Sequence, residues 1–196
     1  MKWVFVTPGE IWALLRQTQA FLTDRLDDPD APRTLIVTFV APLAAINCIA
    51  VFVRSLIVES LLAGFILGIG TFALQLGVWL SLAIILPAIA RQFHTTIEDD
   101  HSFALATYAS VPMWLATILF VIPDDYWLVS LWARLAIFGV STFGLFILQR
   151  GFVVLDVRPD VRTPLLVSIA IAYAAGYALL SMLVGLTAHI LLYILT

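Results

Sequence analysis

Long apolar runs, each about as long as a lipid bilayer is thick, recur along this chain of 196 residues. A helix needs roughly 20 apolar residues to cross a hydrocarbon core of about 30 Å, and such runs are far longer than ordinary β-strands. Polar residues do not alternate with apolar ones inside the runs, as they would in a transmembrane barrel. The runs therefore predict membrane-spanning helices.

Five runs meet this criterion: 34–53, 61–90, 102–122, 128–148 and 165–186. The second would reach about 45 Å as a helix, so we expect it to tilt, and Pro87 is a place for it to bend or stop. The apolar tail after the fifth run indicates that its helix continues. The predicted fold is an all-α integral membrane bundle of five transmembrane helices, formed by residues 34–196.

The composition excludes several classes of protein. Hydrophobic residues make up 62% of the chain, charged residues 12%, and the mean hydropathy is +1.05. A soluble domain cannot hide so much apolar surface, so the lipid bilayer is the first expected partner. The net charge of −3 argues against a nucleic-acid partner. No catalytic triad, phosphate loop or cofactor fingerprint appears, so we predict neither an enzyme nor a bound cofactor.

Basic residues predict the orientation in the membrane. With the N-terminus in the cytoplasm, eight of the ten Lys and Arg fall on the cytoplasmic side: Lys2, Arg16, Arg25, Arg33, Arg91, Arg150, Arg158 and Arg162. Only Arg54 falls outside, and Arg134 lies within the fourth run. The positive-inside rule therefore favours a cytoplasmic N-terminus and an external C-terminus.

Residues 1–33 read as a cytoplasmic amphipathic segment. Thr7 and Glu10 have the spacing of a capping box, with Pro8 at the first helical position. The apolar side of the predicted helix contains Ile11, Trp12, Leu14, Leu15, Leu22 and Leu26. We expect this helix to lie in the membrane interface. The alternative is that it packs against the bundle or a partner chain.

Two amides within the apolar runs are candidate site residues. Gln75 continues the face of a Gly64-x-x-x-Gly68 pair in the second run, and Asn47 lies in the first. In a functional interpretation Gln75 lines a substrate pathway. In the structural interpretation, which we favour, the glycines form a helix–helix seam and Gln75 bonds across it, with Asn47 as a candidate partner.

Tyr108 and Arg134 complete the predicted intramembrane polar site. Pro112 cannot donate to the carbonyl of Tyr108, so we expect a kink there. Arg134 lies six residues, or about 9 Å, past Leu128. A charge within a span indicates a functional site by default. The competing interpretation, which we favour, is that Arg134 snorkels to the interface near Asp124 and Asp125.

The loop before the third run contains ligand-type residues. His94, Glu98 and His101 would share one face if residues 91–102 were helical, which would suit a divalent metal. Thr95, Thr96 and Ile97 are poor helix formers, however, and Asp99 and Asp100 suit the positive end of a following helix. We therefore favour a capping role and predict no metal site.

Three short motifs carry a family resemblance: Thr7-Pro8 with Trp12, the segment Phe103-Ala104-Leu105-Ala106-Thr107-Tyr108-Ala109-Ser110-Val111-Pro112, and Ile122-Pro123. They resemble the Yip family of Ypt/Rab-interacting membrane proteins, most closely its prokaryotic members. The Asp-Leu-Tyr-Gly-Pro-type motif of eukaryotic members is absent, so Rab binding is not expected. The resemblance implies five spans, a prokaryotic inner membrane and a membrane-organising role.

Two functions are therefore expected from the sequence. The first is a non-enzymatic protein that acts on membrane organisation through lipids, a membrane-protein partner or a second copy of itself. The alternative is a small transporter or channel for an ion or polar solute, built on Gln75, the Pro112 kink and Arg134. Convergence of these polar groups on one cavity would favour transport.

Overall fold

The apolar runs fold as long helices in the computed structural model, which describes residues 7–27, 32–122 and 127–195. Within these ranges the regular elements are all helical. Five helices there are long and apolar enough to cross a membrane: Pro32–Val58, Leu61–Gln92, Asp99–Leu119, Leu131–Val154 and Pro159–Leu195. The predicted all-α class and the number of candidate spans are confirmed for this part of the chain.

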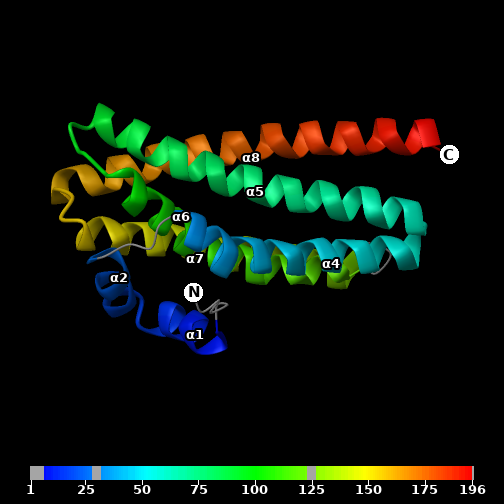
Figure 1. The fold of residues 1–196 in the computed structure, drawn as a ribbon, viewed down its shortest axis with the longest axis horizontal. Coiled ribbons are helices and arrows are strands. Elements are labelled where there is room, and N and C mark those ends of the chain that lie inside the picture. Colours follow the sequence, from blue (N-terminus) through cyan, green and yellow to red (C-terminus); the bar gives the residue numbers. More distant parts are fainter. Residues whose placement is uncertain (1–6, 28–31, 123–126, 196) are drawn as a thin grey trace.

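The helices have the following bounds: α1 Pro8–Arg16, α2 Thr18–Asp27, α3 Pro32–Leu35, α4 Ala41–Val58, α5 Leu61–Gln92, α6 Asp99–Ala116, α7 Trp127–Val154 and α8 Pro159–Leu195. A π-helical turn, Ile36–Val40, joins α3 to α4, and a 3₁₀ turn, Thr117–Val121, extends α6. Successive spans run antiparallel (Figure 1). The α5–α6 and α7–α8 connections lie at one end with α2, and α8 finishes at the other end.

Several helices extend beyond the predicted spans. α4 passes Arg54 and ends at Val58, α5 passes Pro87 and ends at Gln92, and α8 reaches Leu195. A charge ends an apolar window but not the backbone hydrogen bonding of a helix. An internal proline removes one backbone hydrogen bond while the neighbouring bonds remain. The second span therefore does not stop at Pro87, whereas the predicted continuation of the fifth is confirmed.

The third span, α6, is the most enclosed. Of its apolar window 72% is buried, compared with 6% for α8. α6 packs against α5 and α7 and also contacts α2, α3 and α4. In lipid, helices associate through van der Waals packing and hydrogen bonds rather than through apolar burial. α6 therefore joins α7 and the N-terminal helices to α5, which in turn packs against α4 and α8.

Glycine allows α7 to approach α6 very closely. A Cβ atom on Gly144 would collide with the carbonyl oxygen of Ala109, and one on Gly151 would collide with the side chain of Leu105. Neither collision is relieved without moving a helix or repacking Leu105. At the observed helix separation only glycine fits at position 144, whereas a larger residue at position 151 requires Leu105 to repack.

The predicted Gly64-x-x-x-Gly68 seam joins α5 to α4. The carbonyl oxygens of Phe52 and Cys48 lie 3.1 and 3.2 Å from the positions that Cβ atoms on Gly64 and Gly68 would take. This is tighter than ordinary van der Waals contact. The structural interpretation of the glycine pair is therefore confirmed.

Buried hydrogen bonds join α5 to α6. The indole N–H of Trp114 donates to Oε1 of Gln75 at 3.0 Å, and that of Trp79 donates to Oγ1 of Thr107 at 3.0 Å. The hydroxyl of Ser102 also donates to a carbonyl of α5. Each donor meets its acceptor at only one position along the helix axis, so these bonds fix the register of α5 against α6.

The N-terminal segment forms two helices that pack on the bundle. Its capping box is confirmed: Thr7 Oγ1 accepts from the backbone N–H of Glu10, and Glu10 accepts from the backbone N–H of Thr7. Leu14, Leu22 and Leu26 are buried in the main apolar core, whereas Trp12 is 62% exposed. The side chains that reach the core are thus part of the apolar side predicted from the sequence.

Adding one methyl group at Gly144 tests the contact between α6 and α7. We expect Gly144→Ala to lower the unfolding midpoint, because overpacking costs about 1–3 kcal/mol. Gly139→Ala is the matched control on the same helix, since its added Cβ would meet no atom within 4 Å. Thermal unfolding in mild detergent, followed by circular dichroism, compares the two variants. Equal midpoints would contradict the close contact.

A double-mutant cycle tests the bond between Gln75 and Trp114. Gln75→Leu leaves a buried indole N–H without its acceptor, which should cost about 1–3 kcal/mol of unfolding free energy. Adding Trp114→Phe removes that donor, so the double variant should be more stable than the sum of the single losses predicts. Strictly additive losses would show that the bond contributes nothing.

Candidate functional site

The two predicted amides are both buried, but they do not form a hydrogen bond with each other. Gln75 bonds to Trp114, as its predicted role between helices requires. Asn47 is fully buried, and its side-chain amide has no hydrogen-bond partner among the described residues. The predicted bond between Asn47 and Gln75 is therefore not formed. The sequence alone does not show that the indole N–H of Trp114, on α6, donates to the side-chain carbonyl of Gln75.

Tyr108 faces the N-terminal part of the fold. Its ring makes edge-to-face contacts with Phe21 of α2, at 5.3 Å between centroids, and with Phe39, at 5.6 Å. α6 continues through Pro112 to Ala116 and then tightens into the 3₁₀ turn. Tyr108 is completely buried, so it belongs to the core that anchors α2.

Arg134 alone of the four predicted site residues lines a described cavity. This cavity of about 390 Å³ lies between α6, α7 and α8, and we call it the α7–α8 groove. Its lining residues are Met113, Thr117, Arg134, Ile137, Phe138, Ser141, Tyr173, Ala174 and Tyr177. The structure therefore does not bring Asn47, Gln75, Tyr108 and Arg134 together.

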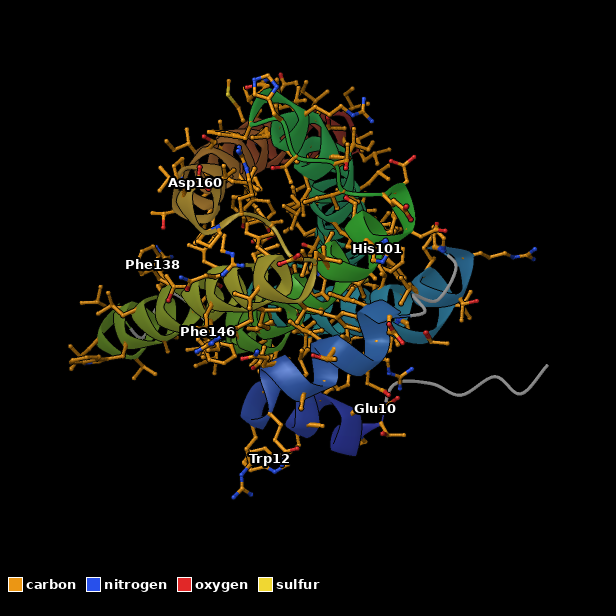
Figure 2. The ribbon with its side chains drawn as sticks, turned by 90° about the vertical axis from the view of Figure 1, so that its left-hand side faces the viewer. Glu10, Trp12, His101, Phe138, Phe146 and Asp160 are labelled. Atoms are coloured by element: carbon orange, nitrogen blue, oxygen red, sulfur yellow. The ribbon has the colours of Figure 1, made fainter. Side chains whose placement is uncertain are left out.

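Helical spacing explains the walls of the α7–α8 groove. On α7, Arg134 and Phe138 are four residues apart, so both side chains lie on the face towards α8. On α8, Tyr173 and Tyr177 have the same spacing, with Ala174 between them as a small residue. Phe138 projects on that side in the end-on view of Figure 2. α8 packs mainly on α5 rather than on α7, which leaves the groove between them.

The groove is open on its lipid-facing side. Arg134, Phe138 and Ala174 are exposed, and Phe138 is 71% exposed. The predicted counter-charges for Arg134, Asp124 and Asp125, lie outside the described residues. Exposure alone fits both interpretations of Arg134, snorkelling and a site, but its place on the groove wall adds support for a site.

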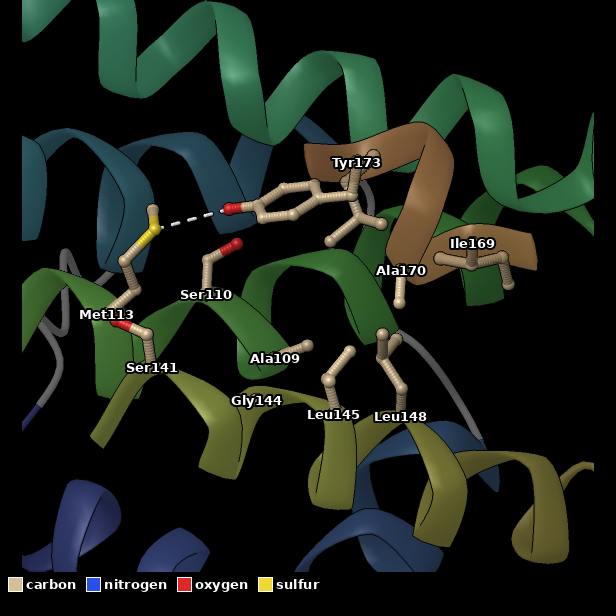
Figure 3. A pocket seen from close by; sticks show the side chains of 11 residues that line it. Ala109, Ser110, Met113, Ser141, Gly144, Leu145, Leu148, Ile169, Ala170 and Tyr173 are labelled. Carbon is tan, nitrogen blue, oxygen red and sulfur yellow. Dashed lines mark hydrogen bonds between the residues drawn. The ribbon is translucent and has the colours of Figure 1, made fainter. Parts of the chain in front are cut away.

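A narrower hollow of about 50 Å³, the inner cavity, adjoins the groove (Figure 3). The two share Met113, Ser141 and Tyr173. At this junction the hydroxyl of Tyr173 donates to the sulfur of Met113 at 3.2 Å (Figure 3). Sequence reasoning missed Tyr173 and Met113, because no local signal says that these helices face one another.

The chemistry of the lining suits the binding of an amphiphilic molecule. The described lining residues of the groove offer a guanidinium, hydroxyls and a thioether on otherwise apolar walls. Such a surface can hold an amphiphilic molecule and orient its polar end.

The loop considered for metal binding is not helical over its first part. His94 has a left-handed backbone, with φ of 53°, and α6 begins only at Asp99. His94 therefore does not share a helix face with Glu98 and His101. His101 instead places Nε2 at 3.0 Å from the Leu26 carbonyl. The part of the chain that the structure describes contains no group of three potential metal ligands.

The favoured alternative for this loop was helix capping. Glu98 occupies the N-cap position of α6 without a side-chain capping bond, and Asp99 and Asp100 fill the first turn. Carboxylates there interact favourably with the positive end of the helix dipole. The position of the acidic residues thus agrees with a role in stabilising α6.

The family resemblance rests chiefly on residues 103–112. In the structure this segment is the buried part of α6. Comparisons with protein-family models, with curated proteins and with solved structures found no match, so membership of the Yip family stays a prediction.

Proposed function

We propose that this chain is a non-enzymatic, multi-pass membrane protein that acts on membrane organisation by binding a membrane component in the α7–α8 groove. The carrying observation is the groove itself, which α7 and α8 line together and which opens where the helices meet lipid. A component dissolved in the bilayer can enter such a groove sideways. This role also agrees with the Yip-type resemblance.

The two helices that form the groove are the least covered by the rest of the bundle. Buried residues make up 22% of the apolar window of α7 and 6% of that of α8. Their exposed leucine, isoleucine and phenylalanine side chains require an apolar environment. Lipid or a partner helix must therefore lie against both walls, so the groove is in contact with its source of ligand.

We further propose that α1 and α2 lie at the cytoplasmic face of a prokaryotic inner membrane. The α5–α6 and α7–α8 connections, which belong to the predicted cytoplasmic side, lie at the same end of the bundle as α2 (Figure 1). The exposed Trp12 then sits at headgroup level, while Leu14 and Leu22 face the bundle. α8 ends on the opposite side in this orientation.

Transport receives less support from the same geometry. The expectation rested on Gln75, the carbonyl of Tyr108 and Arg134 meeting at one wet cavity. Gln75 is instead held by Trp114, and Tyr108 packs against Phe21 and Phe39. A binding role needs only the groove, whereas a pathway needs polar groups aligned across the membrane.

Filling the groove tests the proposed function. Ala174→Phe places a ring inside the groove, while Ala175→Phe adds the same ring to an exposed neighbouring position outside the lining. We expect purified wild type and Ala175→Phe to retain lipid in mild detergent, and Ala174→Phe to retain several-fold less, because the ring occupies the site. Native mass spectrometry measures the retained lipid. Equal retention in all three proteins would remove the groove from the function.

A further inference from the structure

The chemistry along the groove identifies its occupant. Resting on the proposed function, we infer that the α7–α8 groove binds a lipid with an anionic phosphate headgroup. Arg134 holds the headgroup, and the acyl chain lies along α6 towards the inner cavity. Arg134 is the charged residue among the described groove lining, and the rest is apolar or carries a hydroxyl or thioether.

Arg134 has the donors that a phosphate requires. A guanidinium presents five N–H donors in a planar fork, so it can bind phosphate oxygens while keeping another contact. Charge-assisted bonds of this kind strengthen where the surroundings are apolar, as they are beside Ile137 and Phe138. The hydroxyl of Tyr177 lines the same cavity and can donate to an ester oxygen of a headgroup, whereas the hydroxyl of Thr117 already donates to the carbonyl of Trp114.

The charge of the site lies at one end. The groove carries Arg134, whereas the described lining of the inner cavity holds no charged side chain: Leu148, Ile169 and other apolar residues share it with the hydroxyls of Ser110, Ser141 and Tyr173. Arg134 and Leu148 are fourteen residues apart on α7, which corresponds to about 21 Å of helix. This exceeds half of a hydrocarbon core of about 30 Å, so the lining residues extend far enough to contact one acyl chain of a single leaflet along its length.

The dimensions favour a single chain over a docked helix. A helix about 10 Å wide would occupy about 1,600 Å³ over the same length. The groove and the inner cavity hold about 390 and 50 Å³. At the junction of the two cavities, an acyl chain has only to displace a weak sulfur acceptor, Met113, from the hydroxyl of Tyr173.

Headgroup preference tests this inference. Delipidated full-length protein is titrated with dioleoyl phosphatidylglycerol or with dioleoyl phosphatidylcholine, which has the same chains and no net charge. Native mass spectrometry gives the dissociation constants. We expect wild type to bind phosphatidylglycerol about tenfold more tightly, because both lipids offer a phosphate to Arg134 but only phosphatidylcholine also carries a choline cation, which the guanidinium repels. Arg134→Gln should abolish the preference, and Arg134→Lys should keep most of it.

A matched control separates the effect of removing one positive charge from the effect of removing it at the groove. Arg54→Gln makes the same charge change on the same predicted side of the membrane, but on α4 and outside the groove, so it should keep the preference. Circular dichroism confirms that each variant folds. If Arg134→Gln does not fold, the two separate variants Arg134→Lys and Ala174→Phe carry the test. Glycerol phosphate, a headgroup without chains, should not displace the lipid.

The outcomes distinguish the two proposals. An unchanged preference in Arg134→Gln, or equal binding of both lipids by wild type, overturns the anionic-lipid inference but leaves the groove if Ala174→Phe still blocks binding. Displacement by glycerol phosphate assigns the site to a free phosphate compound and also overturns the inference. Binding that Ala174→Phe leaves unaltered overturns the proposed function together with the inference.

Discussion

The contact between Gly144 of α7 and the backbone of Ala109 in α6 sets the geometry of the bundle. Lipid removes apolar burial as a force between helices, so close packing and hydrogen bonding must hold them together. α6 satisfies this requirement on two sides, through the glycines of α7 and through the indole bonds to α5. α4 and α8 in turn pack on α5.

The groove follows from the same constraint. α7 is drawn against α6 at Gly144, whereas α8 packs along α5, where it meets Gly70 and Gly77. The two helices therefore belong to different packing partners and leave space between them. Arg134 lines that space. A charge that is costly in an apolar environment is therefore placed where, in our proposal, it binds a ligand.

Much of the fold could be predicted because lipid acts on each segment separately. Apolar length alone located the five spans, and the spacing of Thr7 and Glu10 located the first helix. Arg134 was also found, since a charge within an apolar run is conspicuous. Tyr173 and Met113 were not, because their role depends on which helices are neighbours, and that information is spread over the whole chain.

Photo-crosslinking in native membranes tests the central claim most directly. A photoreactive amino acid at Phe138 points into the groove, and one at Val140 is an exposed control on the same helix outside the lining. The account predicts that position 138 captures phospholipid enriched in anionic headgroups relative to position 140. The same lipid mixture at both positions, or a protein adduct at position 138, would contradict it.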